Sequence, residues 1–141
     1  ISVIGLKDEP GIAFKLFNLL AKDNINVDVI LQSIGRENSK DISFTVSRDD
    51  ADNAVKILEE NMSRIGGKSI SCRRDVAKVS IVGAGMMSNP GVAAKMFEAL
   101  YNNNINISMI STSEIRVTVL IDERDAERAV NAVHDAFGLE E

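Results

Sequence analysis

The chain has 141 residues and a net charge of −5, with 45% hydrophobic and 26% charged residues. These fractions are typical of a globular protein with a buried core. The acidic balance argues against nucleic acid or an anionic membrane as a partner, since both favour a basic surface. No apolar run reaches the roughly 18 residues of a membrane-spanning helix. The single cysteine, Cys72, cannot form an internal disulfide, and we predict a cytoplasmic protein.

The first half of the chain predicts the element order β-α-β-β-α-β. In the segment "KDEPG", which joins the first strand to the first helix, we expect Asp8 to cap the helix and Pro10 to lie in its first turn. A polar turn, residues 37–41, separates the next two strands, and the second helix ends at Gly66 and Gly67. The strands are predicted at residues 1–6, 25–33, 42–47 and 68–73. The apolar stripes of the two helices are Ile12, Ala13, Leu16, Phe17 and Leu20, then Ala51, Ala54, Val55, Leu58 and Met62.

The second half of the chain repeats the first. "DEPGIAFKLFNLLAKDNINV", residues 8–27, and "SNPGVAAKMFEALYNNNINI", residues 88–107, share Pro-Gly, an apolar helical stripe and Asn-Ile-Asn in the same order. This repetition indicates a duplication. Strands are predicted at residues 78–83, 105–112 and 115–121. The helical stripes are Val92, Ala93, Met96, Phe97 and Leu100, then Ala126, Ala129, Val130, Val133 and Phe137.

The predicted fold class is α+β, with two tandem ferredoxin-like units, each an antiparallel sheet with both helices on one face. We assign residues 1–75 to the first unit and residues 76–141 to the second, with no flexible linker between them. The second unit is predicted to lack one strand, because only "GLEE" follows its last helix. Since the chain starts at Ile1 inside an apolar run, we expect a fragment, a processed chain or missing first residues.

The sequence predicts no catalytic centre. His134 stands alone in a predicted helix, and no Cys/His cluster has the spacing of a metal site. The loop "GAGMMSNPG" has Ser88 where a dinucleotide-binding loop needs glycine. The acidic pairs Asp49-Asp50 and Asp122-Glu123 open helices, where they stabilise the helix dipole. We therefore expect no catalytic residue, metal or cofactor in this chain.

The loops before the first helix of each unit are the candidate ligand sites. A helix N-terminus can hold a carboxylate, and the glycine after each proline lets a ligand approach the backbone closely. On the polar face of the next strand, Asn26, Asp28 and Gln32 offer acceptors for an ammonium group. Together these groups match a free amino acid. The alternative is structural: the loop only caps a helix and turns the chain.

These residues resemble a known family. Tandem units with D-x-P-G after the first strand are similar to ACT domains, the small-molecule regulatory modules of amino-acid metabolism. The stretches "NINVDVILQS", "DISFTVSRDDA", "DVAKVSIVGAGMMSNPGVAAKMFEAL" and "NINISMISTSEIRVTVLIDE" more closely resemble the regulatory region of bacterial aspartate kinase. That region is made as a separate small subunit or as the carboxyl-terminal segment of the large one. The resemblance covers essentially the whole chain.

The resemblance implies an allosteric module without catalysis. It implies binding of threonine, alone or in concert with lysine, and feedback inhibition of aspartyl phosphate formation at the head of lysine, methionine and threonine synthesis. It also implies an aspartate kinase catalytic domain or subunit as partner, to which ATP and Mg belong. In the family, the first unit of one chain and the second unit of another share a site, which implies a homodimer.

Carried over by position, the implied effector-binding residues lie in both units. Those of the first unit are Asp8, Glu9, Pro10, Gly11, Ile12, Ala13, Asn26, Val27, Asp28 and Gln32. Those of the second unit are Val92, Ala93, Asn106, Ile107, Ser113 and Glu114. Ser88 aligns with Asp8, and the second loop is longer by two residues. The two units are therefore not expected to be equivalent ligand sites.

Two other classes of function compete with this one. The chain could be a non-catalytic interaction module whose units only dimerise, binding another amino acid or none. It could also be a small ferredoxin-like enzyme such as an acyl phosphatase, but that chemistry needs an arginine in the anion loop. Neither "KDEPG" nor "MMSNPG" contains one.

Overall fold

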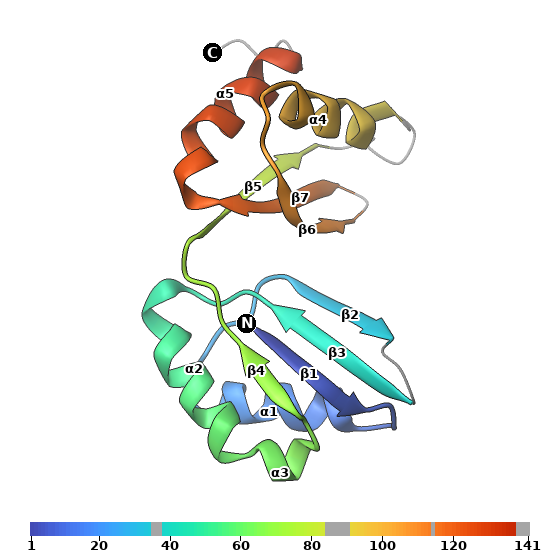
Figure 1. Cartoon of the computed structure of the whole chain (residues 1–141), viewed down its shortest axis with the longest axis vertical. Coiled ribbons are helices and arrows are strands. Elements are labelled where there is room, and N and C mark those ends of the chain that lie inside the picture. The colour runs from blue at the N-terminus through green and yellow to red at the C-terminus, as the bar shows by residue number, and fades with distance from the viewer. Residues whose placement is uncertain (35–37, 84–90, 114, 138–141) are drawn as a thin grey trace. The chain divides into compact units, whose positions relative to one another are not determined.

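The computed structural model describes residues 1–34, 38–83, 91–113 and 115–137. The chain divides into two compact units, Ile1–Arg74 and Asp75–Glu141, and each is described here by itself (Figure 1). Both units have an antiparallel sheet with helices on one face, as the sequence predicts for a ferredoxin-like fold.

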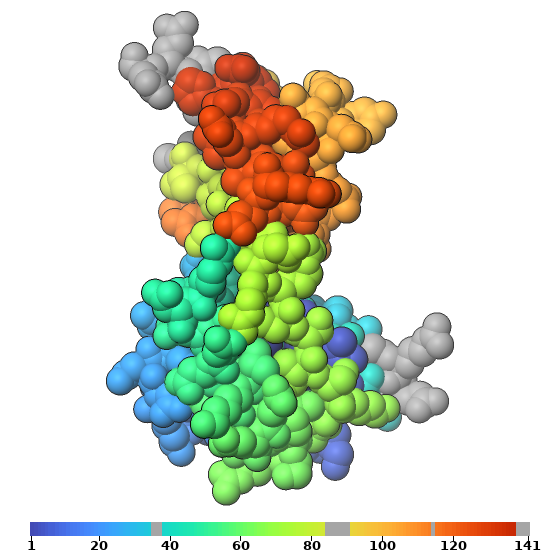
Figure 2. All heavy atoms as spheres, turned by 60° about the vertical axis from the view of Figure 1, so that its left-hand side comes forward, coloured from blue at the N-terminus to red at the C-terminus, as the bar shows by residue number. Residues whose placement is uncertain are grey.

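The first unit is built on a four-stranded sheet with the order β2-β3-β1-β4. Its elements are β1 (Ser2–Lys7), α1 (Ile12–Lys22), β2 (Ile30–Ile34), β3 (Ser39–Phe44), α2 (Arg48–Glu60), α3 (Met62–Ile65) and β4 (Ser69–Ser71). The space-filling view shows that α2 adjoins α3 and β4 at the surface of this unit (Figure 2). The order leaves β2 and β4 as the two edges of the sheet.

The core of the first unit lies between the sheet and its helices. The predicted stripe of α1 is confirmed, since Ile12, Leu16 and Leu20 are buried. Phe17 packs against Phe44 of β3 in an edge-to-face contact, with ring centroids 5.5 Å apart. Such aromatic pairs add about 0.5–1.5 kcal/mol to the burial of their apolar area.

A bulge at Gly5 interrupts the pairing of β1 with β3. Gly5 has φ of 75°, and the register shifts between Val3 and Leu6. Its N–H donates to Oδ1 of Asp41 at 2.9 Å. Because the bulge adds one residue, Val3 and Leu6 both reach the core although three positions separate them.

The second unit has a three-stranded sheet with the order β5-β7-β6 among its described residues. Its elements are β5 (Val76–Val82), α4 (Gly91–Asn102), β6 (Ile107–Thr112), β7 (Arg116–Asp122), a 3₁₀ turn (Glu123–Asp125) and α5 (Ala126–Ala136). The largest fully buried side chains at its centre are those of Met96, Leu100 and Ile121. The amino group of Lys95 in α4 lies 5.0 Å from the centre of the Phe137 ring, which follows α5. This cation–π contact joins α4 to the end of α5.

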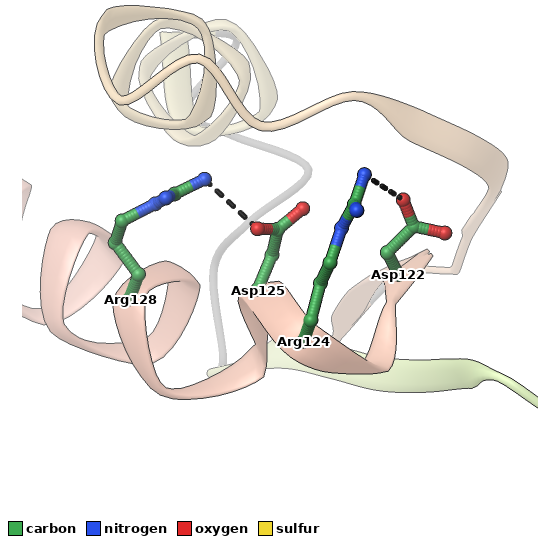
Figure 3. A network of polar contacts seen from close by, with 4 residues as sticks. All are labelled: Asp122, Arg124, Asp125 and Arg128. Atoms are coloured by element: carbon green, nitrogen blue, oxygen red, sulfur yellow. Dashed lines mark hydrogen bonds and ion pairs between the residues drawn. The ribbon is translucent and has the colours of Figure 1, made fainter.

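Two ion pairs mark the junction of β7 with α5 (Figure 3). Arg124 lies 3.4 Å from Asp122, and Arg128 lies 2.9 Å from Asp125. Both arginines are largely exposed, so these pairs contribute little to stability. Asp122 ends β7 and Glu123 begins the 3₁₀ turn, so the predicted acidic pair precedes α5 rather than opening it.

Several predicted boundaries are wrong, and β2 is the clearest case. It begins at Ile30 rather than at residue 25. The backbone of residues 28–29 still bonds to Thr45, but Oγ1 of Thr45 also accepts the N–H of Val29 at 2.9 Å. This side-chain bond replaces regular strand pairing before Ile30.

Three further expectations are corrected by the structure. β3 begins at Ser39, so most of the predicted turn at residues 37–41 is strand. The second helix is divided at Asn61, whose side chain donates back to the carbonyl of Ile57 at 2.7 Å. Val130 of α5 was expected to point inward, yet it is 51% exposed.

Within the described ranges, no helix combines the length and apolar character that crossing a membrane requires.

Candidate functional site

The loop between β1 and α1 ends at Gly11, which precedes the helix in a left-handed conformation with φ of 90°. No side chain caps α1, so the expectation that Asp8 caps it is wrong. Pro10 likewise lies before the helix rather than in its first turn. The first helical bond runs from the N–H of Lys15 to the carbonyl of Gly11 at 3.0 Å. The amides of the first turn therefore have no intrahelical acceptor. An anion that binds next to them is stabilised by hydrogen bonds and by the helix dipole.

Space is available at Gly11 for a ligand to approach. A Cβ built on Gly11 would meet no atom within 4 Å. The glycine is thus needed for its backbone conformation, and its surroundings remain open. An uncapped helix start beside an open glycine is suited to a carboxylate.

The start of β3 holds this loop in place. The N–H of Asp8 donates to the carbonyl of Asn38 at 2.8 Å, and Lys7 pairs with Ser39. Lys40 brings its amino group to 4.0 Å from Oδ1 of Asp8. Figure 1 shows the ends of β1 and β2 and the start of β3 at the same end of the first sheet. The loop and the β2–β3 hairpin therefore form one structural unit.

Lys40 was missed in the sequence because residues 37–41 resembled a polar turn. Its side chain is 10% exposed, against 49% for that of Asp8. The signal that could have found it is the two-residue period of Lys40, Ile42 and Phe44, which share the buried face of β3.

Gln32 lies at the same end of the sheet as this loop. It pairs in register with Ile42, and the next pair on that face joins Ile34 to Lys40. Paired residues of antiparallel strands point to the same side, so Gln32 is on the helix side of the sheet. It is exposed because β2 is an edge strand.

The other predicted residues of the first unit lie elsewhere. Asn26 and Asp28 are exposed, but they come before β2, just beyond the far end of α1. Asn26 precedes β2, whereas Gln32 lies within it. Val27 packs against the core instead. Gln32 thus lies at the end of the sheet where the β1–α1 loop begins, whereas residues 26–28 follow the far end of α1.

The second unit has the same arrangement where it is described. Val92 and Ala93 lie in the first turn of α4, and Asn106 lies beyond the other end of that helix. Ile107 begins β6 and packs against the core, whereas Ser113 is exposed after β6 and its N–H donates to the carbonyl of Arg116 at 2.8 Å. Ser88 of the second loop and Glu114 lie outside the described residues.

No catalytic arrangement is visible in the part of the chain that the structure describes. His134 is half-buried on α5, and no group of three or more His, Cys, Asp or Glu side chains in the described ranges could hold a metal ion. The groups at the site are those of binding: the uncapped first turn of α1, a carboxylate, an amide side chain and the ammonium of a largely buried lysine side chain.

The chain matches the family model of the ACT domain over residues 1–62 and 79–137. It is 46% identical over 140 residues to an aspartokinase of Pseudomonas aeruginosa, which covers 99% of this chain and 34% of that protein. The crystal structure of the regulatory subunit of aspartate kinase from Thermus thermophilus is 47% identical, with a TM-score of 0.86 over 96% of this chain and 89% of that subunit. Aspartate kinase of Clostridium acetobutylicum, described as an allosteric enzyme, is 29% identical with a TM-score of 0.80, over 96% of this chain and 32% of that one.

The chain therefore belongs to the ACT domain family, within which it corresponds to the regulatory region of aspartate kinases. It spans about a third of the length of the curated relatives, 34% in the Pseudomonas aeruginosa protein. The predictions of an α+β tandem fold and of an aspartate kinase regulatory region are both confirmed.

Proposed function

We propose that this chain is the allosteric module of an aspartate kinase, that it binds threonine, alone or in concert with lysine, and that binding inhibits the kinase. The observation that carries the proposal is the uncapped start of α1, which follows Asp8 and lies after the end of β1, at the end of the sheet where Gln32 also lies. The match to a regulatory subunit over 89% of that subunit's length supports the regulatory role.

Each group of the proposed ligand has a partner of suitable chemistry in the first unit. The first-turn amides of α1 would donate hydrogen bonds to the carboxylate, because a helix N-terminus carries partial positive charge. The carboxylate of Asp8 would hold the ammonium group, and the exposed amide of Gln32 would bond to the hydroxyl. The open space at Gly11 admits the ligand backbone.

A homodimer would complete this site. Edge strand β2 exposes Ile30 and Ile34, by 49% and 83%, and α1 exposes Phe14 by 71%. An unpaired edge flanked by exposed apolar side chains is suited to pairing with a second copy of the chain. The partner would then supply second-unit residues to the site. Those residues are Val92, Ala93, Asn106, Ile107, Ser113 and Glu114.

The alternative proposal is an ACT module that dimerises and binds another amino acid or none. The exposed β2 edge fits this function equally well, since it does not depend on a ligand. Calorimetric titration separates the two, because a module that only dimerises gives no saturable heat with threonine.

The same titration tests how the ligand is oriented. Threonine amide and N-acetylthreonine each lack one of the two charges, so both should bind at least about tenfold more weakly than threonine. Equal binding of the amide would contradict the role of the helix start. Equal binding of the N-acetyl compound would contradict the role of Asp8.

A further inference from the structure

Lys40 is a charged side chain on the buried face of the first sheet. It pairs with Leu6 of β1 and with Ile34 of β2, and its side chain is 10% exposed. Lysine is almost never buried this far unless it is paired. Its described partner is the carboxylate of Asp8, at 4.0 Å. This distance is that of an ion pair without a direct hydrogen bond.

The Lys40 ammonium lies next to the proposed threonine site. Asp8 begins the ligand loop, and Gln32 follows the Ile34–Lys40 pair on the same face of the sheet. A buried charge is screened by solvent much less than an exposed one. Lys7 and Glu9 also flank Asp8, but both are exposed, so their effect on a ligand is weaker.

We propose that Lys40 determines the specificity of this site, because the ammonium of its largely buried side chain repels amino acids with a positively charged side chain and thereby favours a neutral one. The inference rests on the proposed function and names the ligand class that the first unit accepts. It also implies that lysine, acting in concert with threonine, binds outside the β1–α1 loop.

The test compares threonine with 2,3-diaminobutanoate of the same configuration, in which an amine replaces the hydroxyl. Both are titrated calorimetrically into the whole chain, at a pH where that amine is protonated, with the diamine measured by displacement of threonine. The variants are Lys40→Met and Lys40→Gln, which remove the charge, and Lys40→Arg, which keeps it. The readout is the ratio of the two Kd values within each variant. Any general loss of affinity cancels in this ratio.

We expect the unaltered chain and Lys40→Arg to discriminate strongly against the diamine. In Lys40→Met and Lys40→Gln, the ratio of the Kd of the diamine to that of threonine should fall about tenfold. This is the effect expected when one charge close to the ligand is removed from a partly screened site. The two uncharged variants serve as checks on each other, so misfolding of one leaves the comparison intact.

The possible failures are distinguishable. If the unaltered chain does not bind threonine, the proposed function and this inference are both overturned. If it binds threonine and the uncharged variants discriminate as strongly as the unaltered chain, only the role of Lys40 is overturned. The role of Lys40 would also be overturned if Lys40→Arg lost as much discrimination as the uncharged variants, because Lys40→Arg retains the charge.

Discussion

Asn24 and Asn104 have the same left-handed backbone conformation, with φ of 58° and 57°, at the same point of the two units. Each follows the first helix of its unit, and the next residue, Ile25 or Ile105, is buried in the core. The N–H of Ile25 donates to the carbonyl of Leu20 at 3.1 Å, and that of Ile105 to Leu100 at 2.9 Å. This is a Schellman-type helix end, in which asparagine tolerates the left-handed position. Helix termination thus accounts for the first two residues of the repeated Asn-Ile-Asn.

The helix ends can be tested with matched variants in the two units. Asn24→Ala and Asn104→Ala should each lower the free energy of unfolding by about 1 kcal/mol, because alanine strains the left-handed conformation. Asn24→Gly and Asn104→Gly are the controls and should stay within about 0.5 kcal/mol of the parent. Urea unfolding measures all four. Equal effects of alanine and glycine would contradict the backbone explanation.

A second matched pair of variants, Gly5→Ala and Gly83→Ala, tests whether the bulge in β1 requires glycine. Gly5→Ala should destabilise the chain by about 2 kcal/mol, since φ there is 75° and the new Cβ would lie 2.7 Å from Cδ of Lys68. Gly83 aligns with Gly5 after the first strand of the second unit, but its Cβ would meet nothing within 4 Å. Gly83→Ala should therefore be nearly neutral in thermal or urea unfolding. A neutral Gly5→Ala would show that the bulge does not require glycine.

Variants at two neighbouring positions of β2 distinguish an effect on ligand binding from an effect on folding. Gln32→Ala should weaken threonine binding by about 1–3 kcal/mol and leave the unfolding transition unchanged. Ser33 is equally exposed but pairs with Asp41, on the opposite face of the sheet. Ser33→Ala should therefore bind threonine as the parent chain does. Calorimetry on both variants measures this, and equal affinities would remove Gln32 from the site.

Asp8 and Lys40 are expected to be coupled energetically. Asp8→Ala should lower stability by about 1 kcal/mol, a modest loss because solvent screens this half-exposed carboxylate. The loss arises from leaving Lys40 without its partner, so Lys40→Met in the same chain should recover most of it. A double-mutant cycle by urea unfolding gives the coupling. If the cost of Asp8→Ala is the same with and without Lys40, the ion pair contributes nothing.

The regular parts of the fold could be predicted from the sequence because burial imposes a period on it. Leu16 and Leu20 of α1 follow the helical period, and Val119 and Ile121 of β7 follow the strand period. Val130 shows the limit of this reasoning, since an apolar residue next to the stripe of α5 remains exposed.

The site was harder to predict because its geometry depends on contacts between distant segments. Pro10 and Gly11 indicate a turn before α1, but only the fold shows that Asp8 bonds to Asn38 rather than to the helix. Lys40 lies in a polar stretch, and its two-residue spacing from Ile42 and Phe44 is the only local sign that it belongs to the buried face of β3. Alternation placed Asn26 and Gln32 on one face of a single strand, but β2 begins at Ile30 and Asn26 precedes it.

The unequal sheets have a consequence for how the two units exchange amide hydrogens. β1 lies between β3 and β4, whereas β5, its counterpart, pairs with β7 and has no further neighbour among the described strands. Amides of β1 are thus protected on both sides and exchange when a larger part of the first unit opens. The outward face of β5 has no second strand beside it in the described part of the chain, so we expect its amides to exchange earlier in a deuterium time course than those of β1. Two copies of one ancestral strand would then report very different opening free energies.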